Sequence, residues 1–320
     1  MASKVLNREI VHKAVTEEFW RLEPGEVFAP DFQIDFPNAA PGIPQHLDEF
    51  EVERYFFWLQ ETVKTWNVQL HQLYGTPDPD VFWAVSTVSA CVHWGGQDGN
   101  FETRRFARYE LKDGKIRLLV ELSNPLRWLE AAGREIPVFR MDLEHPRVNA
   151  ALAEKQQAKH LSGRKAQDMS DEAVQARTAG GIRAFMSGDY WRAVTEIASY
   201  APELDAKVWF LPPEMKESYP PEMAERVEIW SQLSCPYIEF DRMGRVWETD
   251  DPHVFFCEYR CFGITDWLGN NTPNSRYRNR YVYVLHFDDA GQICCCEEVL
   301  NPINKYNSVN ISLPSFPYYF

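Results

Sequence analysis

The strongest constraint on this chain is an internal repeat of about half its length. Trp20-Arg21 recurs as Trp191-Arg192, and later landmarks follow in the same order in both halves, with offsets of 171 to 177 residues. This period is too long for a solenoid, so we interpret each repeat as a complete domain. The other landmark pairs are Phe28-Ala29-Pro30-Asp31 with Tyr200-Ala201-Pro202-Glu203, Asp78-Pro79 with Asp251-Pro252, Val81-Phe82 with Val254-Phe255, and Glu121-x-x-Asn124-Pro125 with Glu298-x-x-Asn301-Pro302.

Length and charge limit the classes to which this protein can belong. The 320 residues predict two domains of roughly 150 residues, each long enough to bury a core. A formal net charge of −14 offers no attraction for nucleic acid or an anionic membrane, so neither is an expected partner. The N-terminus lacks an apolar signal segment and no stretch approaches ~18 apolar residues, which predicts a cytoplasmic protein without a membrane span.

The seven cysteines include the run Cys294-Cys295-Cys296. Neighbouring residues on a strand point to opposite faces, so these thiols do not converge on one metal, and their spacing fits no zinc motif. We interpret them as reduced, mostly buried thiols and predict no metal and no cofactor.

Each half shows the same predicted order of elements: a helix, a proline-rich loop, an aromatic helix and a meander of long strands. This order indicates an α+β fold with helices packed on one face of a sheet. In the first half we predict helices at 5–21 and 47–64 (the latter capped by Asp48), a loop at 24–44, and strands at 68–74, 81–94, 101–111 and 115–122. In the second half we predict helices at 182–200 and 222–233, a loop at 212–221, and strands at 254–265, 277–287 and 293–300.

The segment between the repeats is polar. Residues 149–175 are rich in Ala, Gln and Lys and are predicted to form a helical linker. The expected division is therefore a first domain at 1–145, a linker at 146–177 and a second domain at 178–320.

Glu121 and Glu298 are the main candidates for chemistry. Each lies near the end of a strand that the following Asn-Pro pair must terminate, since proline cannot donate to a strand ladder. Strand alternation places Leu119 and Arg117 on the face of Glu121, and Cys296 on the face of Glu298. On a concave face, burial would raise the pKa of the carboxyl group toward the range useful for proton transfer. The alternative is an exposed strand-end glutamate.

Two aromatic patterns accompany these carboxylates. Tyr55, Trp58 and Leu59 form a helical stripe, which is typical of core packing but would also wall a pocket beneath a concave sheet. Tyr277, Asn279, Tyr281 and Tyr283 share one strand face, and Arg278 and Arg280 share the other. The first copy has Phe101 in place of Tyr277. The two pockets therefore differ, or one copy is structural, or the segment is a solvated face backed by core tyrosines.

Together these motifs resemble one family. Trp58, the Asp78-Pro79 turn, Tyr277-Arg278-Asn279 and the two Glu-x-x-Asn-Pro strings are similar to those of the phenazine biosynthesis protein A/B (PhzA/PhzB) family. That family is part of the wider SnoaL-like, or nuclear-transport-factor-2-like, superfamily of ketosteroid isomerase-like folds. The resemblance covers nearly all of each copy and is clearer in the second.

The resemblance implies two tandem cone-shaped domains, each a curved antiparallel sheet packed on helices around an internal pocket. Family members form homodimers, so this chain would be an internal pseudo-dimer, with further self-association left open. The family activity is acid/base-assisted condensation of small cyclic amino-ketones, with a pocket glutamate matching Glu121 and Glu298 and a pocket tyrosine matching Tyr277. The family histidine falls on Tyr55 and Val227, its serine on Leu59 and Ser231, and its carboxylate-binding arginine has no match in either copy.

The leading hypothesis is a cofactor-independent enzyme of secondary metabolism that condenses, cyclises, isomerises or dehydrates a cyclic small molecule. Glu298, Glu121 and Tyr277 are the predicted catalytic residues. A non-catalytic binding or scaffold protein of the same fold is the alternative, and a third reading has one active and one structural copy. The residues expected to bind substrate are Tyr55, Trp58, Ser231, Trp230, His93, Arg117 and Cys296.

Overall fold

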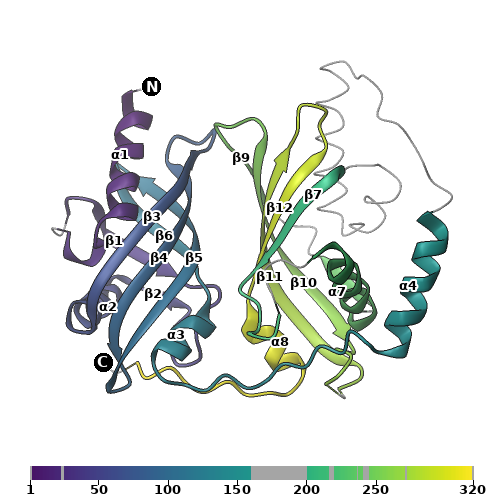
Figure 1. Cartoon of the computed structure of the whole chain (residues 1–320). Helices are drawn as coiled ribbons and strands as arrows, with labels where there is room; N and C mark the ends of the chain where they lie inside the picture. Colours follow the sequence, from purple (N-terminus) through teal and green to yellow (C-terminus); the bar gives the residue numbers. More distant parts are fainter. Residues whose placement is uncertain are drawn as a thin grey trace.

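The computed structural model describes residues 2–22, 25–159, 200–215, 220–235, 237–240, 245–270 and 272–318. Two halves stand side by side, each built on a six-stranded sheet, with the two sheets facing one another across the middle of the molecule (Figure 1). Helices cover the faces that point away from this junction (Figure 1). The predicted α+β fold with two tandem halves is therefore confirmed.

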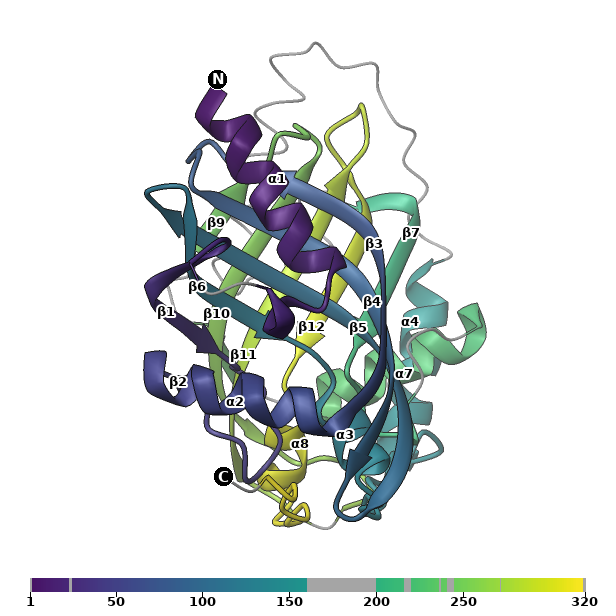
Figure 2. The ribbon, with the colours of Figure 1, turned by 90° about the vertical axis from the view of Figure 1, so that its left-hand side faces the viewer.

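In the first half the sheet order is β2-β1-β6-β5-β4-β3. Figure 2 shows α1 and α2 lying across the face of this sheet that is turned away from the second half. The elements are α1 (Ala2–Thr16), η1 (Phe19–Arg21), β1 (Phe28–Asp35), β2 (His46–Leu47), α2 (Glu49–Thr62), β3 (Val63–Gly75), β4 (Val81–Trp94), β5 (Gln97–Lys112), β6 (Lys115–Leu122) and α3 (Pro125–Ala131).

In the second half the sheet order is β7-β12-β11-β10-β8, and β9 also pairs with β10. The elements are α4 (Pro146–Lys159), β7 (Tyr200–Trp209), α7 (Pro221–Ser234), β8 (Tyr237–Phe240), β9 (Arg245–Glu248), β10 (Val254–Thr265), β11 (Ser275–Phe287), β12 (Ile293–Leu300) and α8 (Pro302–Ser308). Apart from its last residue, which begins β7, the helix predicted at 182–200 lies outside the described residues, as does the linker beyond residue 159.

The sheets are mixed rather than purely antiparallel. β1 pairs in parallel with β6, and β7 pairs in parallel with β12. Pro30 concealed β1 within the predicted loop at 24–44, because a proline argues against a regular strand. Pro30 lies where the β1–β6 register shifts, between Phe28 and Gln33, and such irregularities tolerate a residue without an N–H donor.

The landmark residues end the same strands in both halves. Asn124 caps α3 by accepting a hydrogen bond from the Leu126 N–H at 3.1 Å, and Asn301 caps α8 through the Ile303 N–H at 3.0 Å. In each case proline follows at the first helical position, where its fixed φ favours the helix. The predicted cap of α2 is also confirmed: Asp48 accepts from the Glu51 N–H at 3.0 Å within a capping box.

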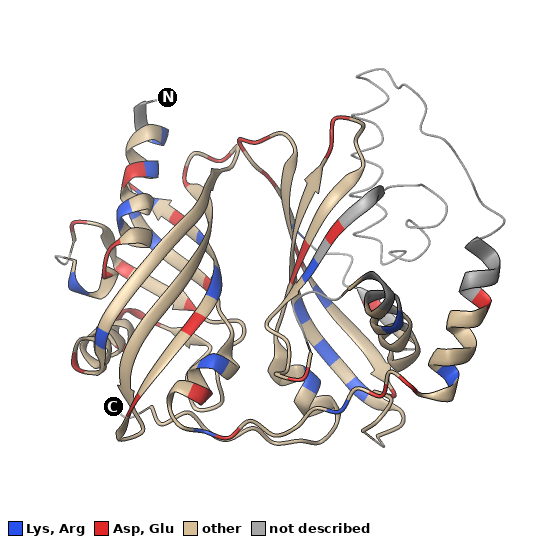
Figure 3. Cartoon of the chain, viewed as in Figure 1, with Lys and Arg blue, Asp and Glu red and all other residues tan. Residues whose placement is uncertain are grey.

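The two sheets pack through their facing surfaces as a pseudo-dimer. Trp83 stacks on Phe256 with ring centroids 4.5 Å apart. Charged side chains lie at the same junction: Glu258 is 3.6 Å from Arg108 of the first half and 3.2 Å from Arg280. Basic residues recur along β10 and β11 in Figure 3, and the predicted division of β11 into a buried tyrosine face and an arginine face is confirmed.

The segments after α3 and α8 cross to the opposite half (Figure 1). Phe139 follows α3 but packs edge-on against Trp267 and Tyr306 of the second half, at 5.7 and 5.6 Å. Phe316 follows α8 but packs against Trp94 of the first half at 5.1 Å. Phe139 and Phe316 are 177 residues apart, so they are equivalent in the repeat. Each half is thus completed by the tail of the other.

Candidate functional site

Glu298 occupies the interior face of the second sheet. It lies on β12 directly opposite Tyr283 of β11, and the Tyr283 hydroxyl donates a hydrogen bond to its carboxylate. Burial raises the pKa of Glu298 above its ordinary value of 4.5, while the positive charge of Lys305 and the Tyr283 bond act against this rise. The predicted interior position of this carboxylate, with Cys296 buried on the same face, is what the structure shows.

Lys305 is the cation of this interior, and our sequence reasoning missed it. It lies on α8 with only 5% of its surface exposed, and its ammonium sits 4.9 Å from the ring centroid of Trp267. Burial lowers its pKa, and the negative charge of Glu298 partly restores it. The equivalent residue of the first half is Trp128, which packs against Trp94 at 5.7 Å. The sequence does contain a signal for Lys305, because a lysine stands there in the second repeat where the first repeat has the aromatic Trp128.

A chain of hydroxyl and amide groups extends this site. The Asn279 amide donates to the Tyr277 hydroxyl at 2.6 Å, and the Tyr277 and Tyr281 hydroxyls are 2.9 Å apart. Asn279 also accepts from the Asn301 N–H at 3.2 Å, which ties the chain to the start of α8. Burial raises the pKa of both tyrosines well above 10, so they remain protonated donors. Glu298 adds to the rise at Tyr281, which places that hydroxyl within its electrostatic reach.

Trp230 and Ser231, the two predicted substrate-binding residues of α7, differ in how deeply they are buried. Trp230 is fully buried, donates from Nε1 to the Leu268 carbonyl at 3.0 Å and packs on Trp267 at 5.5 Å. It is a wall of the interior rather than an exposed contact. Ser231 is half-buried, and its carbonyl accepts from the Cys235 N–H at 3.0 Å.

Glu121 has the equivalent position in the first half, with a different partner. Arg105 lies 3.8 Å from its carboxylate and is only 1% exposed. The Arg105 guanidinium also donates to Ser86 Oγ at 3.1 Å and to the Val15 carbonyl at the end of α1, at 3.2 Å. Burial raises the pKa of Glu121, and Arg105 opposes that rise. Sequence reasoning missed Arg105, although alternation along β5 places it on the interior face with Phe101 and Tyr109.

Aromatic side chains fill the space around Glu121. Tyr55 stacks on Trp58 at 5.9 Å, and Trp58 stacks on Trp94 at 5.4 Å. The crossing tail adds Phe316 and Tyr318 against Trp58, at 5.9 and 5.1 Å. Tyr55 and Trp58 are therefore packed core residues. The carboxylate of this half, Glu121, is buried among them, whereas Glu298 of the second half is partly exposed.

Two predicted pocket residues lie outside the interior. His93 is exposed between the inward-facing Val92 and Trp94, and its ring contacts Asp98 at 2.7 Å. Arg117 is exposed and pairs with Asp31 at 3.1 Å. The expected alternation fails at Arg117 because the β5–β6 register shifts between Glu110 and Leu111, which turns Ile116 inward instead. Both assignments to the pocket were wrong.

Within the described ranges, no group of three or more His, Cys, Asp or Glu side chains is placed to hold a metal ion. The helices in those ranges are also too short or too polar to cross a membrane.

The fold is thus that of a tandem α+β protein in which the interior of each half holds a carboxylate beside a buried cation. Residues 220–317 match the family model described as phenazine biosynthesis protein A/B, which confirms the resemblance for the second repeat. No curated protein matches the chain.

Several solved structures are similar to single halves of this chain. One is a phenazine biosynthesis-related protein from Pseudomonas aeruginosa, with 22% identity and a TM-score of 0.39, covering 44% of this chain and 94% of that one. A putative isomerase from Bacillus subtilis has 19% identity and a TM-score of 0.35, covering 42% and 96%. A putative SnoaL-like polyketide cyclase from Jannaschia sp. CCS1 has 14% identity and a TM-score of 0.33, covering 41% and 94%.

Proposed function

We propose that this protein is a cofactor-independent acid/base enzyme of secondary metabolism, acting on a cyclic small molecule in the second half. The observation that carries the proposal is Glu298, a carboxylate enclosed with the Tyr283 hydroxyl and the buried Lys305 ammonium. Titratable groups whose pKa values are displaced by burial and by one charged neighbour are typical of catalytic sites. The family match of residues 220–317 supports the same class of chemistry.

In this proposal Glu298 moves a proton at the substrate ring. Burial raises its pKa, so its carboxylate is a stronger base than that of an exposed glutamate, and its acid form then returns the proton to the substrate. The negative charge that develops on the substrate oxygen is stabilised by the Lys305 ammonium and by the Tyr281 hydroxyl. Tyr277 acts as a positioning residue, because its hydroxyl holds that of Tyr281 at 2.9 Å.

The first half has a structural role in this account. Its carboxylate, Glu121, is held by Arg105, and the aromatic rings around Trp58 fill the remaining space. This is the reading with one active and one structural copy. We also propose the division into domains at 1–145 and 178–320, joined by a linker at 146–177.

Solvent deuterium exchange tests the acid/base function with simple cyclic compounds in place of the natural substrate. A panel of cyclic ketones and enones in D2O is followed by proton NMR with the wild-type protein and with Glu298→Gln. Loss of the general base is expected to slow exchange by about 100-fold or more. Glu239→Gln serves as the control because Glu239 is an exposed carboxylate on β8.

A non-catalytic binding protein is the competing function. It predicts that panel members bind to the wild-type protein without enhanced exchange. Exchange that is equally fast in Glu298→Gln and wild type would contradict the proposed mechanism.

A further inference from the structure

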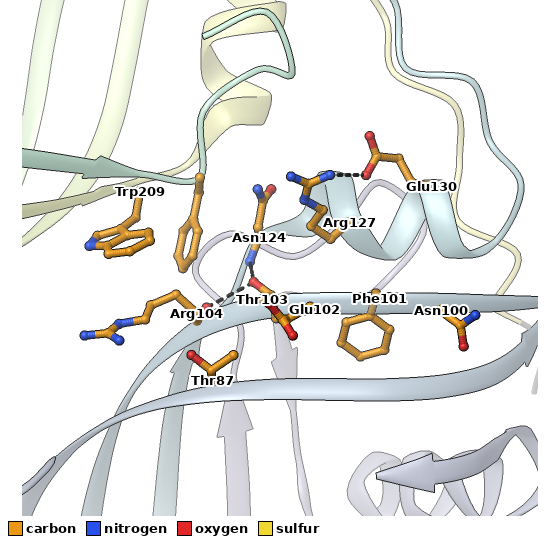
Figure 4. A pocket seen from close by; sticks show the side chains of 11 residues that line it. Thr87, Asn100, Phe101, Glu102, Thr103, Arg104, Asn124, Arg127, Glu130 and Trp209 are labelled. Carbon is orange, nitrogen blue, oxygen red and sulfur yellow. Dashed lines mark hydrogen bonds and ion pairs between the residues drawn. The ribbon is translucent and has the colours of Figure 1, made fainter. Parts of the chain in front are cut away.

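A cavity of about 490 Å³ opens at the seam between the halves (Figure 4). Strand β5 and helix α3 of the first half form its floor and one wall, and the end of β7 forms the other wall. It is separate from the Glu298 interior. The residues used below are Arg104, Asn124, Arg127, Trp209 and Phe210, all of which line it.

At the equivalent place on the other side of the pseudo-dimer, the polar side chains bond to the protein itself. There the Asn301 amide donates across the seam to the Pro37 carbonyl at 3.3 Å, and Asn304 donates to Asn279 at 3.3 Å. The neighbouring Asn38 donates to the Ser123 carbonyl at 2.5 Å. The first of these bonds joins the two halves, and each of the other two lies within one half.

Three of the residues that make these bonds are replaced on the open side. Pro37 and Asn38 correspond to Trp209 and Phe210, and Asn304 corresponds to Arg127. Asn124, the counterpart of Asn301, is only 8% exposed, and its Oδ1 is used to cap α3. Its amide nitrogen has no hydrogen-bond partner among the described residues, and Figure 4 shows the side chain directed between Arg127 and the Trp209 wall. This nitrogen is accessible from the cavity, so it can donate a hydrogen bond to a ligand acceptor there.

The open side also carries aromatic walls and positive charge. Phe210 is buried at φ +64°, a left-handed conformation that is costly for a bulky residue and that recurs at functional sites. The Arg104 guanidinium lies 5.2 Å from the Trp209 ring, and its buried Nε has no hydrogen-bond partner in the described part of the chain. The Arg127 guanidinium pairs with Glu130 at 2.9 Å, and an exposed pair of this kind contributes little and is readily exchanged.

We propose that this seam cavity binds a small planar carboxylate, namely an aromatic or heteroaromatic acid. The ring lies against Trp209 and Phe210, and the carboxylate accepts hydrogen bonds from the Arg127 guanidinium and the Asn124 amide. Arginine is suited to this role because its planar fork matches a carboxylate. The Glu102 carboxylate at the rim is exposed and therefore solvated. The size of the cavity lies within the range of small-molecule sites.

The test is calorimetric titration of the full chain with 2-naphthoate, with the uncharged 2-naphthamide as the matched probe. We expect saturable binding of naphthoate and about 10-fold or greater weakening in Arg127→Ala. Arg117→Ala is the control, because Arg117 and Arg127 have side-chain exposures of 52% and 51% and each pairs with one carboxylate. A second variant, Asn124→Ser, keeps a capping oxygen for α3 but removes the amide donor, and it should also weaken binding.

Three outcomes would overturn the proposal: no saturable binding of naphthoate to the wild type at millimolar concentration, equal affinity for naphthoate and naphthamide, or equal effects of Arg127→Ala and Arg117→Ala. Retained deuterium exchange in Arg127→Ala would show that the seam site and the Glu298 site are independent.

Discussion

The crossing tails make a prediction about which half a mutation destabilises. Phe316 follows the second repeat in sequence, is only 3% exposed and contacts Trp58, Trp94 and Trp128 of the first half, at 5.9, 5.1 and 6.1 Å. Truncation of a buried phenylalanine to alanine costs about 3–5 kcal/mol. For a cooperative unit of 150–250 residues this corresponds to a fall in Tm of about 6–20 °C.

Hydrogen exchange followed by mass spectrometry shows which elements the Phe316→Ala substitution destabilises. In Phe316→Ala, protection should fall in α2 and β4 of the first half, while β10 to β12 of the second half keep theirs. Phe50→Ala is the control, because Phe50 is 70% exposed and its loss should change stability by less than about 0.5 kcal/mol. A loss of hydrogen-exchange protection that is confined to the second half would refute the packing of the C-terminal tail on the first half.

Three further predictions concern the enclosed charges. Arg105→Met should lower the unfolding free energy by about 3–5 kcal/mol in denaturant titrations, because it leaves Glu121 buried without its ion-pair partner. Lys305→Met should lower the unfolding free energy and slow deuterium exchange, because Glu298 loses the positive charge that favours its ionised form and its pKa rises further. An unchanged or higher stability would contradict this account. The raised pKa of Glu298 means that the folded state holds a proton which the unfolded state releases near pH 4.5, so stability should fall as pH rises from that value through the folded pKa. Titrations between pH 4 and 8 should show a shallower fall for Glu298→Gln, and an unchanged slope would contradict burial of this carboxyl.

Much of the sheet could be predicted because its strands are long and bounded by clear turn residues. Strands β4, β6, β10 and β12 begin and end where the sequence places them. Asp-Pro and Asp-Gly turns and the terminal Asn-Pro pairs mark these ends, and the alternation between them is regular. The positions of Glu121 and Glu298 inside the two halves followed from the same alternation.

The rest depends on contacts between residues far apart in sequence. Arg105 and Lys305 are typical surface residues by type, and only the assembled fold buries each with a carboxylate. The inward turn of Ile116 in place of Arg117 arises from a register shift, which alternation does not reveal. The tails around Phe139 and Phe316 have no periodicity, so their crossing was not predictable from pattern.

The central claim is that the second half carries the chemistry and the first half supports it. It is tested most directly by deuterium exchange rates of Glu298→Gln and Glu121→Gln, measured side by side on one substrate and under conditions where both variants are folded. We predict that Glu298→Gln loses about 100-fold or more of the exchange rate. Glu121→Gln should keep the wild-type rate within a few-fold while losing stability, because Arg105 is left without its partner. Equal losses in both variants, or a greater loss in Glu121→Gln, would contradict the claim.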